Sequence, residues 1–381
     1  MDVFINDLSV FMPNEPVDNE NIENVLGKVS HISSRVKNII LKNNQIKSRY
    51  YAINPETGII THSNAQMAFL AIQKLKPYSD FKLHDIELLA AGTTTADLIA
   101  PGYALMILGL LKISPCEAVT TSGICVSGMT ALKYAYMNVA LGFKSNAVSV
   151  ASELSSSFLR SKFYSQNSNY DEINLEKNPV LAFEAEFLRW MLSDGAGAMF
   201  ISNKPCSSGL SLKIDWIEIM SFAGEHETCM YAGGVKDSEG NIIGWREKEL
   251  IQSYNNEYVM TVKQDVKLLE KSIVTTMEQT LLKLIKKYDL SPAQFDYFVP
   301  HYSSGYFKDK FYQGMKNVAF EIPYDRWFTN LETKGNTGSA SIYIILEELF
   351  KSGKLRKNDR LLCFIPESGR FSHSFMQLTV I

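Results

Sequence analysis

Several classes of protein are disfavoured by what this chain lacks. It has no excess of positive charge: 38 Lys and Arg stand against 41 Asp and Glu, giving a net charge of −3. Proteins that bind nucleic acids are usually basic, so we expect no nucleic-acid partner. The longest apolar run, residues 103–113, is shorter than the roughly 20 residues that span a bilayer. Because the N-terminus also lacks the basic start and apolar core of a signal peptide, we expect a cytoplasmic protein with no membrane span.

Cysteine is scarce and scattered. None of the five cysteines forms a CxxC pair, which argues against a disulfide framework and against a zinc site. We expect no metal ion and no cofactor, and we expect four of the thiols to fill the core as small apolar side chains: Cys116, Cys206, Cys229 and Cys363. Cys125 differs from these because it lies between two glycines, directly before an apolar run.

The chain has no low-complexity linker, but it resembles itself. The stretches HDIELLAAGTTT (84–95) and AQFDYFVPHYSS (293–304) both place an acidic residue before an apolar run that ends in a polar turn. About thirty residues after each comes a glycine-flanked turn followed by an apolar pattern of helical period, whose apolar positions fall within residues 131–139 and 342–350. A strand pattern follows both helices, in NAVSVASE and DRLLCFIPES.

This repetition of strand, turn, helix and strand predicts a duplicated α/β fold, with mixed sheets sandwiched by helices and a boundary near Pro205. Ordinary α/β alternation is the alternative explanation. Further helices are predicted at residues 63–75 and 263–288.

Cys125 is predicted at the first turn of a helix. Free backbone N–H groups and the positive end of the helix dipole favour a thiolate there, and Gly123 and Gly128 allow the chain to turn tightly and a ligand to approach the backbone closely. The alternative is a buried, inert cysteine.

The second repeat supplies two partners for this thiol. His301 ends the strand DYFVPH, and Asn336 in KGNTGSAS occupies the helix mouth that corresponds to Cys125. In a duplicated fold the two mouths would face each other, so that the three side chains converge. A thiol that takes an acyl group, with an imidazole and an amide beside it, suits acyl transfer through an enolate. Separately, each partner also has a structural explanation: a satisfied histidine and a helix cap.

Six stretches, in this order and spacing, resemble the thiolase superfamily and within it beta-ketoacyl carrier-protein synthase III: IELLAAGTTTADLIAPG, TTSGICVSGMTAL, SVASE, SDGAGAM, VPHYSS and KGNTGSAS. The resemblance covers most of the chain and implies a thiolase-like, duplicated α-β-α-β-α five-layer fold. It implies an N-terminal half over residues 1–204, with the nucleophile and an inserted cap segment at about 155–190, and a C-terminal half over residues 205–381.

The resemblance also implies the chemistry. Cys125 matches the acylated nucleophile of an acyltransferase of the 3-oxoacyl synthase type, which performs a decarboxylative Claisen condensation with a malonyl or beta-ketoacyl thioester. His301 and Asn336 match the pair that stabilises the enolate, and Glu153 in SVASE is a candidate base. The implied donors are acyl carrier protein or CoA thioesters, the implied assembly is a homodimer, and the implied context is fatty-acid or polyketide synthesis.

The chain departs from the family pattern in two motifs near the predicted site. HYSS replaces the family's HQAN after His301. ESGRF replaces the GGGF loop, so that Gly369 and Arg370 would supply the backbone N–H that completes an oxyanion hole with that of Cys125. Glu367 could form an ion pair with Arg370, at the rim or in the site.

Two further departures concern binding. The segment after Glu153 is longer than in the family, and its aromatic residues could wall a pocket or a subunit contact: Phe158, Phe163, Tyr164, Phe183, Phe187 and Trp190. The region before residue 50 lacks the family's tryptophan clamp for CoA, which favours a carrier protein as donor. Four basic residues there could meet an acidic carrier or form a solvated face: Lys37, Lys42, Lys47 and Arg49.

These departures are similar to synthase III relatives that join two acyl chains into dialkylresorcinol or cyclohexanedione products. A non-catalytic subunit of a heterodimeric synthase is another alternative, but such subunits usually lose the nucleophile. A thiolytic thiolase is disfavoured because the C-terminal glycine loop carries no second cysteine.

Overall fold

The stretches predicted as buried strands form the centre of the molecule. The structure is a computed structural model and describes residues 1–29, 34–165, 187–237, 239–247 and 260–381. Nine strands form one hydrogen-bonded sheet in the order β13-β14-β15-β8-β1-β7-β6-β4-β5. Their bounds are β1 Phe4–Phe11, β4 Leu88–Thr93, β5 Glu117–Ser122, β6 Asn146–Glu153, β7 Gly195–Ser202, β8 Leu212–Ser221, β13 Tyr297–Pro300, β14 Arg360–Glu367 and β15 Ser372–Val380.

This sheet consists of two parts, one from each half of the chain. Only two residue pairs join β1 to β8, Phe4 with Lys213 and Ile5 with Leu212. The first part contains β1, β4, β5, β6 and β7, and the second contains β8, β13, β14 and β15. In each part the strands before and after the repeated helix run parallel: β4 pairs with β6, and β13 pairs with β14. Pro205, the predicted boundary, lies between β7 and β8, and the boundary stays a prediction.

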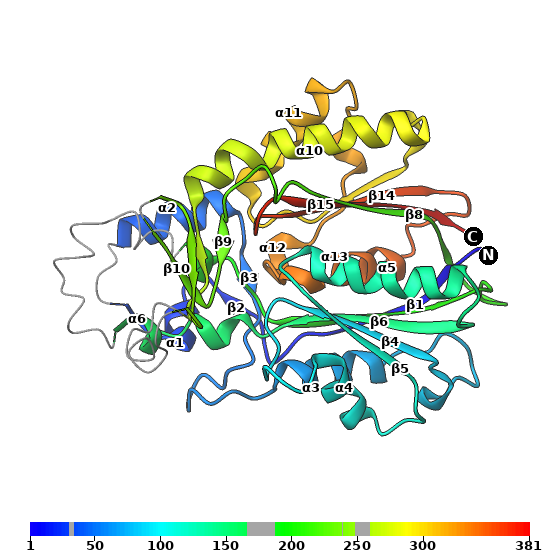
Figure 1. Cartoon of the computed structure of the whole chain (residues 1–381), viewed down its shortest axis with the longest axis horizontal. Coiled ribbons are helices and arrows are strands. Elements are labelled where there is room, and N and C mark those ends of the chain that lie inside the picture. The colour runs from blue at the N-terminus through cyan, green and yellow to red at the C-terminus, as the bar shows by residue number, and fades with distance from the viewer. Residues whose placement is uncertain (30–33, 166–186, 238, 248–259) are drawn as a thin grey trace.

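Helices fill three layers around the two sheet parts (Figure 1). The matched helices α5 (Val126–Ala140) and α13 (Ser341–Lys351) lie between them, where α5 contacts strands of both parts. Helices α3 (Asn64–Gln73) and α4 (Tyr103–Leu111) cover the outer face of the first part, and α10 (Val266–Tyr288) and α11 (Lys308–Asn317) lie beyond the second. The predicted five-layer α-β-α-β-α fold is therefore confirmed.

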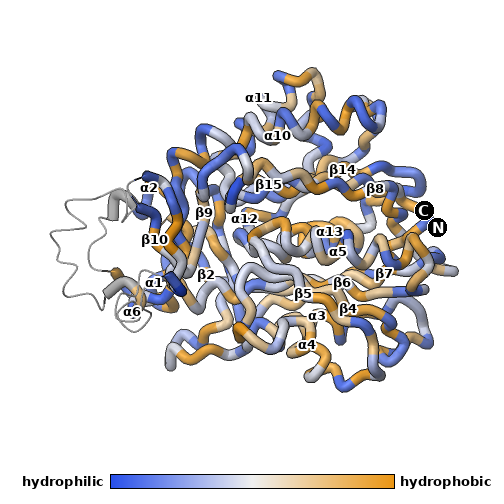
Figure 2. Tube along the Cα trace, in the orientation of Figure 1, coloured by the Kyte–Doolittle hydropathy of each residue, from blue (hydrophilic) through white to orange (hydrophobic). Residues whose placement is uncertain are grey.

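The hydropathy of the helices follows their layers. Figure 2 shows apolar residues along most of α13, which is buried on several sides, and a mixture of polar and apolar residues along α10. A helix between two sheets is buried all round, whereas an outer helix needs only one apolar face. No helix in the described ranges is long and apolar enough to cross a membrane.

Capping side chains set the start of the outer helices. Helix α3 begins after Ser63, which forms a capping box with Gln66, in agreement with the predicted start of this helix. Helix α10 begins three residues later than predicted, because Asp265 caps it by accepting a hydrogen bond from the amide of Leu268. Lys263–Gln264 instead form strand β12, which pairs with β9 (Met230–Tyr231).

The remaining elements are short and lie around the core. They are the strands β2 Val17–Asp18, β3 Ser48–Arg49, β10 Gly234–Lys236 and β11 Ile242–Gly244, the helices α1 Ile22–Leu26, α2 Ser34–Asn44, α6 Lys162–Ser165 and α12 Leu331–Lys334, and the 3-10 helices η1 Leu83–Asp85, η2 Ser155–Phe158, η3 Leu188–Trp190, η5 Pro292–Gln294, η6 Gly305–Phe307, η7 Tyr324–Arg326 and η8 Gly338–Ala340. Strands β9 to β12 gather at the end of the central layer where the matched helices begin (Figure 1).

The two matched helices meet closely at their N-terminal ends. A Cβ atom on Gly128 of α5 would clash with the carbonyl oxygen of Ser339, which belongs to η8 just before α13. The hydroxyl of Tyr343 donates a 2.8 Å hydrogen bond to the carbonyl of Gly128. The predicted reason for glycine here, close approach of a ligand, is therefore wrong: Gly128 admits the backbone of the other half.

Candidate active site

Cys125 is the residue that links strand β5 to helix α5. It is the N-cap residue of α5, as the sequence predicts, and its side chain is buried. The chain bends at Gly123 after the strand. The apolar residues of α5 then pack in the layer between the sheet parts. The sulfur atom is thus fixed at a helix mouth inside the molecule.

The protonation of Cys125 differs from the prediction. Burial raises the pKa of this thiol well above its usual value, and the carboxylates of Glu367 and Glu153 raise it further. A helix N-terminus favours a thiolate, but here desolvation and two nearby acids outweigh it. Cys125 therefore rests as a neutral thiol at neutral pH.

Asn336 lies beside the mouth of the matched helix, although not at its first residue. It precedes η8, and α13 begins at Ser341. Its backbone is fixed by hydrogen bonds with Met191 and Ser193, and its Oδ1 accepts a hydrogen bond of 3.0 Å from the amide of Gly338. This fixed carbonyl orients the side chain and leaves the Nδ2 donors for a ligand.

His301 directly follows strand β13. Its backbone N–H donates a hydrogen bond of 2.8 Å to the carbonyl of Phe364 in β14, and the imidazole is buried. Burial lowers the pKa of His301 to about 4, so the ring is neutral at neutral pH. Its Nε2 has no hydrogen-bond partner among the described residues. A buried polar atom without a partner costs free energy and is typical of functional sites.

Glu153 ends strand β6 and connects the two halves. Its Oε1 accepts hydrogen bonds from the amide and hydroxyl groups of both Thr94 and Ser339. Burial raises the pKa of Glu153 to about 7, although these hydrogen bonds oppose the shift. A carboxyl group with such a pKa can accept and release protons near neutral pH.

A small cavity of about 40 Å³ brings several of these groups together. Cys125, Asn336 and Glu153 line it, together with Gln264 and Ser368. His301 is not among the described residues that line it, whereas Ser303, two positions further along the chain, is. The structure therefore places two residues of the predicted triad, Cys125 and Asn336, around one cavity with the candidate base. His301 is buried, and the chain reaches the cavity two residues after it.

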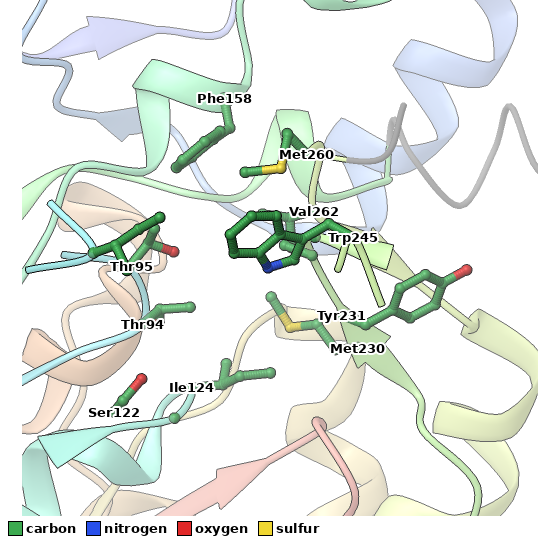
Figure 3. A pocket seen from close by; sticks show the side chains of 14 residues that line it. Thr94, Thr95, Ser122, Ile124, Phe158, Met230, Tyr231, Trp245, Met260 and Val262 are labelled. Carbon is green, nitrogen blue, oxygen red and sulfur yellow. The ribbon is translucent and has the colours of Figure 1, made fainter. Parts of the chain in front are cut away.

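A larger apolar cavity of about 450 Å³ adjoins the small one. The two share Thr94, Thr95, Ile124, Phe158, Met230 and Val262 as lining residues. Figure 3 shows the indole of Trp245 among the side chains that line this cavity, between Phe158 and Met230. A cavity of this size and lining is suited to an aliphatic chain.

The end of β14 contacts the residues around Cys125, but the charges there and in the following turn are arranged differently from the prediction. The Oε2 atom of Glu367 accepts hydrogen bonds from the amides of Ile124 (3.2 Å) and Val126 (3.1 Å). Arg370 instead donates to the carbonyl of His226. The predicted ion pair between Glu367 and Arg370 is therefore wrong: the amides around Cys125 provide the closer partners for the carboxylate. Gly369 packs on Ile124, and a Cβ atom added to it would lie 3.1 Å from that side chain.

The basic residues before position 50, predicted to meet a carrier or to form a solvated face, are arranged differently. Arg49 is fully buried and donates hydrogen bonds to Asn19 and to the carbonyl of Trp190, so it cannot meet a carrier. Lys37 pairs with Glu23, and Lys47 pairs with Glu332. Sequence periodicity does not distinguish Arg49 from its exposed neighbours, because its burial depends on the distant η3.

The aromatic residues of the inserted segment have separate fates. Phe158 lines both cavities, whereas Trp190 is a core side chain. Phe183 lies outside the described residues. Trp245, Met230 and Gln264 were not predicted as site residues. Their stretch carries no recognisable motif. Met230 and Gln264 are brought together by the pairing of β9 with β12, and Trp245 directly follows β11, which pairs with β10.

The fold and the site define a class of protein: a duplicated α/β fold with a cysteine at the mouth of a central helix. A family model described as the C-terminal part of 3-oxoacyl-[acyl-carrier-protein (ACP)] synthase III matches residues 285–365. Beta-ketoacyl-[acyl-carrier-protein] synthase III from Clostridioides difficile is 24% identical over 355 residues, covering 92% of this chain and 90% of that protein.

Solved structures agree with this class. OleA from Xanthomonas campestris superposes with a TM-score of 0.76 at 18% identity, covering 99% of this chain and 98% of that chain. AbyA1, a tetronic acid condensing enzyme, superposes with a TM-score of 0.73 at 16% identity, covering 99% of both chains. The fold is that of the thiolase superfamily. The resemblance predicted from the sequence is confirmed: the chain is an enzyme of the acyltransferase class, similar to beta-ketoacyl-[acyl-carrier-protein] synthase III and, in fold, to solved condensing enzymes.

Proposed function

We propose that this chain is a ketosynthase that carries an acyl group on Cys125 and extends it by Claisen condensation. The observation that carries the proposal is the position of Cys125: its side chain lines a small cavity with Asn336, and that cavity adjoins an apolar one. An acyl group on the sulfur would have its carbonyl beside the amide and its alkyl chain among apolar side chains.

The reaction has two halves. The sulfur of Cys125 loses its proton and attacks the carbonyl carbon of an acyl thioester, and the carrier thiol leaves with a proton. A malonyl thioester then loses CO2, and the resulting enolate carbon attacks the acyl-enzyme carbonyl. A C–C bond forms, the C–S bond breaks, and the departing sulfur of Cys125 takes up a proton from solvent, which restores the thiol.

Each site residue has a role in these reaction steps. The neutral imidazole of His301 and the Nδ2 group of Asn336 donate hydrogen bonds to the enolate oxygen. The backbone N–H of Cys125, with that of Gly369 or Arg370, stabilises the oxyanion formed at the acyl carbonyl. A neutral histidine suits this role, because the Nε2 atom can carry the hydrogen that the enolate accepts.

The names of the relatives support a proposal for the donors, and the sheet order supports one for the assembly. The C. difficile relative is named for acyl carrier protein, and one OleA structure contains lauric acid and lauroyl-CoA. We propose acyl carrier protein or CoA thioesters as donors for this chain, in the cytoplasm and in fatty-acid or polyketide synthesis. We also propose a homodimer, since β5 is an edge strand of the sheet and can pair with a second copy.

A second candidate joins two acyl chains without decarboxylation, as in dialkylresorcinol synthesis. Glu153 favours it, because a carboxyl group with a pKa of about 7 that lines the cavity can remove the α-proton of a beta-ketoacyl thioester. The enolate formed in this way attacks the acyl-enzyme as before, the C–S bond breaks, and Glu153 gives the proton to the departing sulfur of Cys125. No CO2 is released on this route.

Product analysis distinguishes the two. The protein is incubated with acyl thioesters of graded chain length and with either malonyl or beta-ketoacyl carrier protein. Products extended by two carbons, with CO2 release, support the decarboxylative reaction. Products containing both acyl chains, without CO2 release, support the second candidate. If the folded protein gave no extended product with any combination of acyl thioester and carrier protein, both candidates would be refuted.

A further inference from the structure

A carboxylate occupies the mouth of the nucleophile helix. The Oε2 atom of Glu367 accepts hydrogen bonds from the backbone amides of Ile124 and Val126, which are the residues on either side of Cys125. The amide of Cys125 itself is not one of these donors. One side chain from the second half of the chain thus fixes the turn that presents the sulfur, and it leaves the amide of Cys125 for an oxyanion.

The surroundings of Glu367 show that this contact is built into the fold. The carboxylate lies beside Gly123, where an added Cβ would be 3.7 Å from Oε2, and beside Gly369, where it would be 3.2 Å from Oε1. The next residue, Ser368, is held by a 2.9 Å hydrogen bond to Gln264 and lines the small cavity. Glycine on both sides leaves room for the carboxylate between the two turns.

We propose that Glu367 is a positioning residue for Cys125: it fixes the turn around the sulfur and places a negative charge beside it, which disfavours the reactive thiolate in the substrate-free protein. This inference rests on the proposed role of Cys125 as nucleophile. It adds a control of reactivity that the sequence does not reveal, because residues 125 and 367 are far apart in the chain.

The charged groups around the sulfur are few. Glu367 reaches it from the end of β14, and Glu153 reaches it from the end of β6. His301, at the end of β13, is neutral at neutral pH. The guanidinium of Arg370, in the turn that follows Glu367, donates hydrogen bonds to the carbonyl of His226. Both ionisable acids therefore oppose a thiolate, and Glu367 is the one that also holds the backbone.

The experiment measures the rate at which iodoacetamide alkylates Cys125 as a function of pH, read by peptide mass spectrometry. The protein is the full chain without substrate, so the result does not depend on whether condensation occurs. Glu367→Gln keeps an oxygen that accepts from both amides but removes the charge. Glu56→Gln, an exposed carboxylate on a turn, is the matched control for loss of one charge.

We expect Glu367→Gln to shift the alkylation profile toward lower pH and to raise the rate near neutral pH at least threefold, on the order of what a shift of one pKa unit gives once the lower nucleophilicity of the thiolate is included. Glu56→Gln should leave the profile unchanged. A Glu367→Gln protein that folds with the wild-type profile would overturn the proposal. Glu367→Ala, tested in parallel, should show the same shift; a fall in thermal stability without any shift in either variant would mean a purely structural role, and would also overturn it.

Discussion

The hydroxyl of Tyr343 in α13 donates a hydrogen bond of 2.8 Å to the carbonyl oxygen of Gly128 in α5. This bond joins the two matched helices at the ends where the candidate site lies. Gly128 permits it, because any side chain there would overlap the carbonyl oxygen of Ser339. The position of Cys125 relative to Asn336 thus depends on one point of close approach between the two halves.

Replacing Gly128 by alanine should destabilise the fold. The added methyl group meets backbone rather than a flexible side chain, so we expect a loss of about 3 kcal/mol in the free energy of unfolding, at the upper end for overpacked cores. Urea denaturation measures this loss. Gly109→Ala is the matched control, since this helical glycine has no atom near its absent Cβ; it should be neutral or stabilising by about 1 kcal/mol. Equal stability of Gly128→Ala and wild type would show that the helices do not meet as described.

Much of this fold could be predicted from local patterns. The period of apolar residues identifies α5 and α13, and the buried runs identify β4 and β13, because these elements are specified by their own residues. The predicted start of α10 is wrong, because Lys263–Gln264 are held in a strand by Met230–Tyr231, which are distant in the sequence. The reason for glycine at position 128 was also misjudged, since it depends on contact with the other half.

Glu153 should make stability depend on pH. Its folded pKa of about 7 exceeds its ordinary value of 4.5, so the folded chain holds this proton more tightly than the unfolded chain. The resulting stabilisation is fully present below pH 4.5 and is lost as the pH rises through about 7, to the extent of on the order of 3 kcal/mol.

Glu153→Gln imitates the protonated form at every pH. Relative to wild type, we expect the variant to gain stability between about pH 5 and about pH 8, measured by urea denaturation at both values. Asp194, whose pKa is also raised by burial, titrates in both proteins and cancels in the comparison. A stability difference that does not change with pH would contradict the assignment of a raised pKa to Glu153.

Trp245 should limit the length of the acyl chain. Its indole lines the apolar cavity, and a Cβ atom on Gly233 would lie 3.1 Å from it. Trp245→Ala should shift the preferred donor to chains longer by a few methylene groups, each contributing about 0.8 kcal/mol when buried. The yield of acyl-enzyme across a series of acyl thioesters measures the preference. Trp245→Phe should give a smaller shift, whereas an unchanged preference in both variants would place the acyl chain elsewhere.

His301 and Asn336 should act after acylation. We expect His301→Ala and Asn336→Ala to form the acyl-enzyme at near wild-type rates but to lose CO2 release from malonyl carrier protein by roughly a hundredfold or more, as when one donor is removed from an oxyanion site. Parallel assays of adduct mass and CO2 release separate the two steps. Loss of acylation in a folded variant would instead assign that residue to the first half of the reaction.

The candidate site was only partly predictable. Cys125 and Asn336 were identified from their glycine-flanked turns, and the structure places both around one cavity. The resting state of the thiol was predicted incorrectly, because it depends on burial and on Glu367, a residue that only the packing of the two halves brings to α5. Trp245 is not predictable from the sequence either, because its place in the cavity comes from strand pairing and not from a motif.

The proposed reaction requires a covalent acyl group at Cys125. Intact-protein mass spectrometry after incubation with an acyl carrier or acyl-CoA donor tests this directly, with peptide mapping to locate the adduct. We expect one acyl mass on the wild type and on Cys116→Ala, which removes a half-buried thiol outside the site, and none on Cys125→Ala. A folded wild-type protein without an adduct, or an equal adduct on Cys125→Ala, would show that Cys125 is not the nucleophile.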